Sequence, residues 1–393
     1  MVTKLVPLGA LAILCLNRVG RHFGTPRVYS ITKHSGFVPS LEYFKKQVFS
    51  RNLASYNVVE PGDFAYATIH LDEGAIGIAP EYGAVSPMYT VFRVVSRDVH
   101  SPYLLRFLRS PRALAQYQHL GQGSAERRRT ISFRRLADLL VPLPSVSEQR
   151  RIVAVLDQVD ALRAKRREVL AQLRVLGQSV YVEMFGDSAA GSRNWPIVPV
   201  RDFVEKFEGG RNVVADDLNA ASTYRVLKVS AVTSLTYDPS ESKPAPVGYR
   251  PPPRHLVRPG DLLFSRANTA ELVGATAYVG NTPLNTLLPD KLWRFVWRRP
   301  LRVHPLYVHS LFSQPTTRRL FSALATGSSG SMKNISQVKV LSVLVRLPPW
   351  KIQFEFARRV EAIERLKEKQ RAHLAEMDAL FASLQHRGFR GEL

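Results

Sequence analysis

The sequence predicts an α+β protein in which two globular heads are joined by two long helices that pair as an antiparallel coiled coil. Three observations predict it: the sequence contains an internal repeat, each copy ends in a long helix with an apolar stripe, and most of the net positive charge lies outside those helices. A chain of 393 residues is also too long for one ordinary domain. We expect a first head over residues 1–145, a long helix and hinge over 146–190, a second head over 191–348 and a second long helix over 349–393.

The internal repeat consists of short matching pieces that recur in the same order. Pro61-Gly62-Asp63-Phe64 matches Pro259-Gly260-Asp261-Leu262 at an offset of 198 residues, and Val99-His100 matches Val303-His304 at an offset of 204. Leu143-Pro144 and Leu347-Pro348 keep the offset of 204. The offset only grows, as insertions in the second copy would cause. Units this long are not solenoid repeats, so we interpret the pattern as a tandem duplication of a head and its helix.

Within each head, Pro, Gly and β-branched residues alternate with short apolar runs, which is typical of short strands and turns. The first long helix follows Leu143-Pro144, where Ser145 or Ser147 can cap it and Glu148 lies in its first turn. Its apolar residues are spaced by three and four, with Arg166 in register: Ile152, Val155, Val159, Leu162, Val169, Leu173, Leu176 and Val180. The second helix, from about 350 to 385, repeats this spacing, with Lys367 and Gln370 in register: Phe356, Val360, Ile363, Leu374, Met377, Phe381 and Leu384.

Helices of roughly 35 residues are about 50 Å long, so their stripes exceed what one head can cover. We therefore expect them to pair with each other or to bind a partner protein. The alternative is that each helix packs on its own head.

The charge indicates a polyanionic partner. The chain holds 55 Lys and Arg against 32 Asp and Glu, a net +23. Residues 1–145 carry +9 and residues 191–348 carry +11, whereas the helical segments 146–190 and 349–393 carry only +1 and +2. The 41 arginines outnumber the 14 lysines. Arginine suits bidentate contacts to phosphate and guanine, although a GC-rich genome produces the same bias.

The single cysteine, Cys15, excludes an internal disulfide and a cysteine-based zinc cage, which fits a reducing cytoplasm. The apolar start from Leu5 to Leu16 contains Pro7 and is too short to span a bilayer. We expect it to enter the folded core; the alternative is a signal peptide.

Four pieces of the sequence carry a family resemblance: the run 143–153 that opens the first helix (Leu-Pro-Ser-Val-Ser-Glu-Gln-Arg-Arg-Ile-Val), Trp195-Pro196, the run 259–266, and Gly327-Ser328-Ser329-Gly330. With the duplication, they resemble the specificity subunits of type I restriction-modification systems. The resemblance implies that two target recognition domains each read half of a bipartite DNA site. It also implies that the helices bind methylation subunits, expected to number two, and that restriction subunits join through the assembled complex. One departure is Trp350-Lys351-Ile352-Gln353-Phe354, which replaces the family's acidic-Gln-basic run.

Catalytic signatures are missing from the sequence. It contains no Asn-Pro-Pro-Phe or Asp-Pro-Pro-Tyr methylation motif, no phosphate-binding Gly-Lys-Ser/Thr loop and no ligand-like histidine cluster. We therefore expect a non-catalytic, cytoplasmic, sequence-specific DNA-binding subunit without metal or cofactor. S-adenosylmethionine, ATP and Mg²⁺ are expected only on its partner subunits. Two alternatives stay open: a stand-alone methyltransferase or nuclease with degenerate motifs, and a basic RNA-binding scaffold, which the lack of an aromatic RNA-binding motif disfavours.

The candidate DNA contacts are basic or polar residues in loops. The densest run follows a Gly-Ser loop in the first head, and its counterpart in the second head is also rich in Gly and Ser, which let backbone amides approach phosphate. Arg and Asn after an apolar strand are the types that read guanine and adenine edges; for each residue the alternative is an ordinary solvated loop. The candidates are Arg127, Arg128, Arg129, Arg266, Asn268, Thr269, Ser328, Ser329 and Lys333, with Lys45, Lys46, Arg51 and Arg211 as weaker ones.

Overall fold

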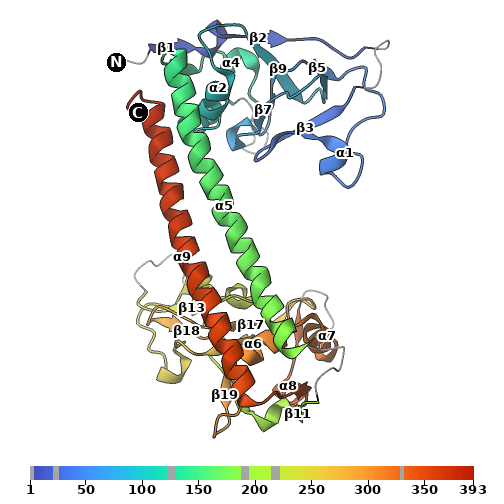
Figure 1. The fold of residues 1–393 in the computed structure, drawn as a ribbon, viewed down its shortest axis with the longest axis vertical. Coiled ribbons are helices and arrows are strands. Elements are labelled where there is room, and N and C mark those ends of the chain that lie inside the picture. The colour runs from blue at the N-terminus through green and yellow to red at the C-terminus, as the bar shows by residue number, and fades with distance from the viewer. Residues whose placement is uncertain (1–3, 21–25, 122–129, 187–193, 214–221, 328–331) are drawn as a thin grey trace. The chain divides into compact units, whose positions relative to one another are not determined.

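The computed structural model describes residues 4–20, 26–121, 130–186, 194–213, 222–327 and 332–393. The chain forms two compact units: Met1–Glu168 with Ala372–Leu393, and Val169–Arg371. Each unit contains one head and a part of both long helices, α5 (Val146–Phe185) and α9 (Trp350–Gly388) (Figure 1). Among the described residues, no helix is long and apolar enough to cross a membrane.

The first head is built from two four-stranded sheets and short helices. Its antiparallel sheet has the order β2-β9-β6-β7, and its second sheet has the order β4-β3-β8-β5, with β3 and β8 parallel. A separate ladder pairs β1 with β10 just before α5. The elements are β1 (Lys4–Pro7), β2 (Ala12–Cys15), β3 (Val28–Thr32), β4 (Gly36–Pro39), α1 (Ser40–Tyr43), β5 (Asn57–Val59), β6 (Phe64–Ala67), β7 (Ile76–Ile78), β8 (Gly83–Val85), β9 (Tyr89–Val94), α2 (Ser101–Leu108), α3 (Pro111–Leu120), α4 (Phe133–Leu136) and β10 (Leu140–Leu143).

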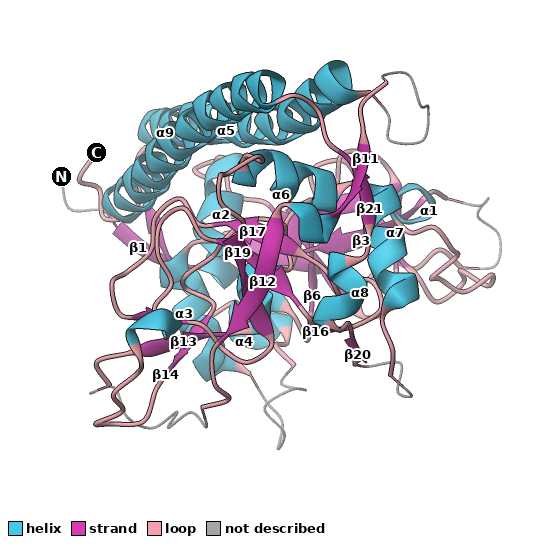
Figure 2. Cartoon of the chain, turned by 90° about the horizontal axis from the view of Figure 1, so that it is seen from below, coloured by secondary structure: helices cyan, strands magenta, loops and turns pink. Residues whose placement is uncertain are grey.

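The second head repeats this topology. Its antiparallel sheet has the order β12-β19-β15-β17, and its second sheet has the order β14-β13-β18. β11 pairs with β21 just before α9, and both strands are labelled in Figure 2. A short ladder of β16 with β20 is added. The elements are β11 (Ile197–Pro199), β12 (Val204–Gly209), β13 (Arg225–Leu227), β14 (Ser242–Pro244), β15 (Leu262–Ser265), β16 (Ala267–Asn268), β17 (Thr276–Tyr278), β18 (Thr286–Leu287), β19 (Leu292–Trp297), α6 (Pro305–Ser313), α7 (Pro315–Leu324), β20 (Lys333–Asn334), α8 (Gln337–Leu341) and β21 (Leu344–Arg346). The matching strand orders confirm the duplication.

The repeated Pro-Gly-Asp turn has a structural role in both heads. Gly62 and Gly260 both have φ of 91°, a left-handed conformation that glycine adopts without steric cost. The carboxylate of Asp63 accepts a hydrogen bond from the backbone N–H of Glu60, and Asp261 does the same for Arg258, each at 2.9 Å. Each aspartate also pairs with an arginine on the neighbouring strand, Arg93 or Arg294. The motif recurs because it shapes the turn that leads into the central strand.

A buried glutamine fixes the start of each long helix. The Gln149 amide donates to the carbonyls of Asp98 (2.7 Å) and Pro144 (2.9 Å) and accepts from the N–H of His100 (2.8 Å). Gln353 makes the same three contacts, with Arg302, Pro348 and His304, exactly 204 residues further along. Gln353 therefore fixes the start of α9 as Gln149 fixes the start of α5, although the residues on either side of Gln353 depart from the family pattern.

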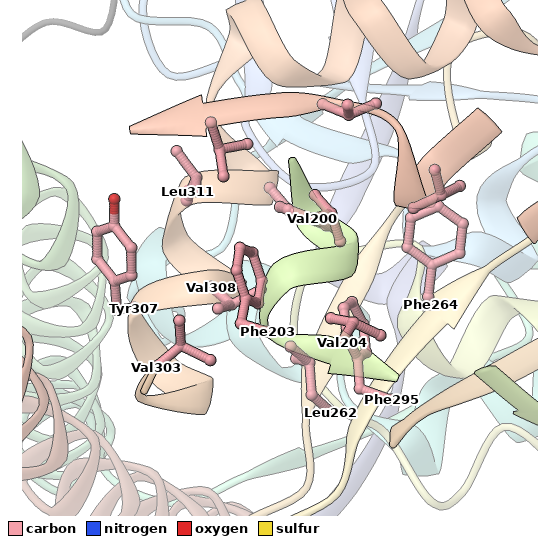
Figure 3. Packing of buried hydrophobic residues seen from close by; sticks show 14 of the residues in the cluster. Val200, Phe203, Val204, Leu262, Phe264, Phe295, Val303, Tyr307, Val308 and Leu311 are labelled. Atoms are coloured by element: carbon pink, nitrogen blue, oxygen red, sulfur yellow. The ribbon is translucent and has the colours of Figure 1, made fainter. Parts of the chain in front are cut away.

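Both ends of the long helices belong to the cores of the heads. In the first unit, Ile152 and Leu156 of α5 are buried with Tyr103 and Phe107 of α2. In the second unit, Tyr181 and Phe185 of α5 and Phe356 of α9 join the cluster around Phe264 and Phe295, whose packing Figure 3 shows. The helices thus pack on the heads as well as on each other.

The pairing of α5 with α9 is antiparallel. Within the first unit, Ile152 lies against Gly388, and the Arg163 guanidinium binds the Asp378 carboxylate at 2.6 Å. Rising numbers on α5 therefore meet falling numbers on α9. At the start of α5, the Ser145 hydroxyl accepts the N–H of Glu148 at 3.3 Å, which identifies Ser145 as the capping residue.

The stripe predicted for α9 is confirmed, and that predicted for α5 is wrong at two of its eight positions. Leu162 (49% exposed) and Leu176 (44% exposed) face solvent, whereas the other six are buried or partly buried: Ile152, Val155, Val159, Val169, Leu173 and Val180. At the two wrong positions the next residue, Arg163 or Gly177, is the less exposed one. Arg163 takes the place expected for Leu162 because its side chain, 17% exposed, lies over the Phe381 ring and pairs with Asp160 and Asp378.

Candidate nucleic-acid interface

Four of the predicted contacts in the second head are brought together at the end of β15. This strand is buried along its length, and the chain leaves it at Arg266 to form the short ladder of β16 with β20. In that ladder Asn268 lies opposite Lys333, and Thr269 follows directly. Residues 65 positions apart in the sequence therefore form one partly exposed group of Arg266, Asn268, Thr269 and Lys333.

Backbone hydrogen bonds, rather than ion pairs, fix the position of Arg266. Its N–H donates to the Lys291 carbonyl at 3.1 Å, and its carbonyl accepts from the N–H of Ile335 at 3.0 Å. The guanidinium lies 5.6 Å from the centre of the Trp293 ring, a cation–π contact. Its Nε is buried and has no hydrogen-bond partner among the described residues. The Arg266 side chain is thus fixed in position, and its Nε–H can still donate a hydrogen bond.

The neighbouring polar groups are also oriented. The Asn268 Oδ1 accepts the backbone N–H of Thr269 at 2.9 Å, which leaves the amide NH₂ as a donor. The Lys333 ammonium donates to the Gly327 carbonyl at 3.0 Å. Together these residues present cationic groups and an amide, the set that binds phosphate and base edges.

Arg318 of α7 positions the loop after Thr269, and sequence reasoning missed it. Its guanidinium donates to the carbonyls of Val273 (2.7 Å) and Glu271 (2.6 Å). In the first head, the guanidinium of Arg109, the residue directly after α2, donates to the Ile76 carbonyl. The repeat gave no signal for Arg318, because Leu114 is the first-head residue at the offset of 204.

The first head carries different residues at the equivalent edge. The carbonyl of Thr68 accepts from the N–H of Ile131 at 2.9 Å, as that of Arg266 does from Ile335. Thr68 therefore corresponds to Arg266. Beyond this position the backbones differ, because residues 68–70 form a turn whereas Ala267–Asn268 form β16 and pair with β20. The side chains available for contacts at this strand end thus differ between the heads in charge and shape.

The weaker candidates are exposed but lie in two separate places. Lys45, Lys46 and Arg51 are exposed on the segment between α1 and β5 of the first head. Arg211 is exposed after β12 in the second head, where the N–H of Gly210 donates to the Pro289 carbonyl at 3.0 Å.

Arg211 acts electrostatically on a buried histidine, which the sequence did not indicate. The pKa of the buried His255 imidazole is lowered by burial and then by the charges of Arg254, Arg211 and Arg294. Arg294 is neutralised by Glu208 and Asp261, whereas Arg254 is exposed, as Arg211 is. The charges of Arg211 and Arg254 both act on His255.

Five predicted contacts, Arg127, Arg128, Arg129, Ser328 and Ser329, lie outside the described residues. Within the described ranges, no group of three or more His, Cys, Asp and Glu side chains could hold a metal ion.

Sequence comparisons find similar proteins of one kind, although no protein-family model matches the chain. The chain is 28% identical over 273 residues to the type I restriction enzyme EcoKI specificity subunit of Escherichia coli (strain K12), a match that covers 64% of this chain and 57% of that protein. It is 31% identical over 163 residues to the EcoEI specificity subunit of Escherichia coli, covering 39% and 27%. The matches therefore span about half, or less, of the length of these curated relatives. They confirm the resemblance to type I specificity subunits.

Structural comparisons cover the whole chain. A chain from a structure that describes complex assembly and conformational transition of the type I R-M system gives a TM-score of 0.60 at 17% identity, covering 100% of this chain and 98% of that one. The type I restriction-modification system S subunit from M. genitalium gives 0.55 at 11% identity, covering 98% and 96%. These likenesses confirm the predicted fold: a mixed α and β protein with two long helices.

Proposed function

We propose that this chain is the sequence-specific DNA-binding subunit of a type I restriction-modification system, and that its two heads read the two halves of a bipartite site. The observation that carries this proposal is the contrast at the equivalent edges of the heads. The first head places Thr68 at the position that Arg266 occupies in the second, and only the second head adds Asn268 and Lys333 through the β16–β20 ladder. Related heads with different polar side chains at this strand end suit two different half-sites.

The charge distribution supports duplex DNA as the ligand. The segments that contain the heads carry +9 and +11, and the helical segments are almost neutral. Cations on the heads would neutralise phosphates and release counterions, which supplies affinity without sequence information. The polar groups after β15 and β6 would add the sequence readout.

The long helices are the proposed docking elements for two methylation subunits, and restriction subunits would join through the assembled complex. Apolar residues remain exposed on both helices outside their shared seam: Leu162, Val175 and Leu176 on α5, and Leu366 and Leu380 on α9. Exposed apolar side chains on near-neutral helices suit a protein partner better than DNA.

Catalysis is assigned to the partners. We propose that this chain holds no cofactor, that S-adenosylmethionine, ATP and Mg²⁺ bind to the partner subunits, and that the complex acts in the cytoplasm on host DNA. The rival functions are a stand-alone methyltransferase or nuclease and an RNA-binding scaffold. Titrating S-adenosylmethionine or Mg²⁺ into the isolated chain tests the first, and competition between duplex DNA and RNA at fixed salt tests the second.

Methylation profiling with head variants tests the bipartite reading. Replacing Arg266→Thr together with Asn268→Ala removes both candidate base contacts from the second head. Each bidentate base contact contributes about 1–3 kcal/mol of discrimination, so we expect the methylated sequence to relax in one half only. Glu205→Gln, at an exposed position of β12 in the same head, is the control and should leave both halves unchanged. A change in both halves, or in neither, would contradict the assignment of one half-site to each head.

A further inference from the structure

The first head contains a cavity of about 540 Å³ that the function proposed above does not use. Its walls come from β3, the segment 44–49 after α1, the end of β6 and the start of β9 (Figure 1). The volume falls in the range of about 300–1,000 Å³ that small-molecule sites occupy. The cavity is therefore large enough to hold a ligand group.

The walls of the cavity are aromatic. Tyr29 and Tyr56 are buried, and Phe44, Phe49 and Tyr89 are partly buried around the same space. Aromatic walls bind flat rings by stacking, and one base stacked on an aromatic side chain contributes about 1–3 kcal/mol. The shape and composition of these walls suit a planar heterocycle.

Polar groups stand together on one side of the lining. Glu73 lies between two basic groups, 3.3 Å from the His70 Nδ1 and 3.8 Å from the Lys33 ammonium, and all three side chains are about half exposed. They place a hydrogen-bond acceptor beside donors, which is the pattern that the edge of a nucleobase requires.

Some of the apolar side chains that line the cavity are also exposed to solvent. Val48 (45% exposed) and Met88 (58% exposed) both line the cavity, so apolar surface is left uncovered there. Exposed apolar surface beside a cavity with a few polar groups is typical of a binding site.

Two features place this cavity beside the proposed DNA contacts. His70, which lines it, lies two residues after Thr68, the first-head counterpart of Arg266. The segment that contributes Phe44, Val48 and Phe49 also carries the exposed cations Lys45, Lys46 and Arg51. Three cations on the segment that walls the cavity would bind phosphates next to any base that enters it.

We propose that this cavity receives a single nucleobase rotated out of the duplex, with Lys45, Lys46 and Arg51 on the adjoining phosphates. The inference rests on the proposed DNA-binding function and adds a readout mode to it. The base would stack against the aromatic walls, and its hydrogen-bonding edge would face His70, Glu73 and Lys33. Extruding a base costs a few kcal/mol, and the cost is lowest for a mismatched pair.

The test uses the full chain in complex with its methylation subunits and duplexes that carry its target site, found by methylation profiling. Each position of the first half-site, apart from the methylated ones, is replaced in turn by 2-aminopurine and, separately, by a mismatch. We expect one position at which 2-aminopurine fluorescence rises on binding and at which the mismatch tightens binding at least several-fold.

Two matched variants locate the base. Val48→Glu places an anion at the cavity, whereas Leu41→Glu makes the same change at an exposed position of the same head that does not line it. Val48→Glu should abolish the fluorescence rise and the mismatch gain, and Leu41→Glu should preserve both. His70→Ala should weaken both and, as an exposed residue, leaves folding intact.

Two outcomes would decide against the cavity, and a third would decide against the proposed function. Site-specific binding without any fluorescence rise would overturn the proposal and leave the proposed function standing. A rise that Val48→Glu and Leu41→Glu affect equally would place the extruded base elsewhere. Loss of all site-specific duplex binding in the unaltered complex would instead refute the proposed function itself.

Discussion

The two heads share their buried contacts and differ where their strands end at the surface. Gln149 and Gln353 make the same three hydrogen bonds, and Tyr103 and Tyr307 each donate to a backbone carbonyl at 2.8 Å, 39 residues further along the chain. In contrast, Thr68 of the first head occupies the position of Arg266 in the second, and the β16–β20 ladder that holds Asn268 and Lys333 has no counterpart among the described strands of the first head.

The difference follows from what each position must satisfy. A buried amide or hydroxyl that loses its partner costs about 1–3 kcal/mol, so the network that joins each head to its helix tolerates little change. A polar side chain at the exposed end of a strand carries no such penalty. Side chains at the exposed strand ends can therefore differ between the heads while the buried hydrogen-bond network stays the same.

The largest expected effect comes from removing the buried glutamine hydrogen bonds that the two heads share. Gln149→Leu and Gln353→Leu each leave backbone groups without their partners, so each should lower the free energy of unfolding of its unit by about 3 kcal/mol. Thermal unfolding followed by calorimetry measures this. Gln158→Leu, an exposed position on α5, is the control and should have little effect. Clearly unequal losses for Gln149 and Gln353 would show that the two networks are not energetically equivalent.

The next effect is a pH dependence of stability that His309 should confer on the second head and that the first head lacks at the matching position. Burial, and then the charge of Lys367, lowers the pKa of His309 in α6 to about 4, and its Nδ1 lies 3.0 Å from the Thr276 hydroxyl. Leu105 is the first-head residue at the offset of 204. Because the unfolded histidine titrates near 6.5, the unfolded state binds more protons between pH 6.5 and 4. The second unit should therefore lose about 3 kcal/mol of stability as the pH falls through that window.

Comparison of the intact chain with His309→Leu, which copies the first head, checks the pH effect. Denaturant unfolding at pH 7 and pH 4.5 should show a smaller difference between the two pH values in the variant. The baseline stability of the variant at pH 7 is also lower if the Thr276 contact contributes. An identical pH dependence in the two proteins would exclude His309 as its source.

The smallest expected effect concerns phosphate contacts of the first head. Replacing Lys45, Lys46 and Arg51 with Gln should flatten the slope of log affinity against log salt by roughly 2–3 units, because each phosphate neutralised contributes about 0.9. Binding of the isolated chain to a duplex across a salt series measures the slope. Lys351, Lys369 and Arg371 of α9 are exposed, and replacing them with Gln removes the same charge. An equal change in slope for both triples would indicate a general charge effect.

The sequence alone determined the duplication, the two long helices and the concentration of charge on the heads. These features depend on order, periodicity and composition, which are local properties. The α9 stripe was predicted completely, including Lys367 and Gln370 in register. The sequence also selected Arg266, Asn268 and Lys333, whose residue types indicated DNA contacts, without indicating that they lie together.

Tertiary structure decided the remaining features because they depend on contacts between distant segments. The α5 stripe is shifted at Leu162 because Asp378 and Phe381, on the other helix, stabilise Arg163 in its place. Arg318 positions the loop after Thr269 through backbone carbonyls about 45 residues away, a contact that no periodicity encodes. The aromatic cavity of the first head likewise forms only when β3, the segment 44–49 and the end of β6 pack together. A hydrophobic stripe specifies which face of a helix is buried, but the partner's side chains decide which polar residues can be buried with it.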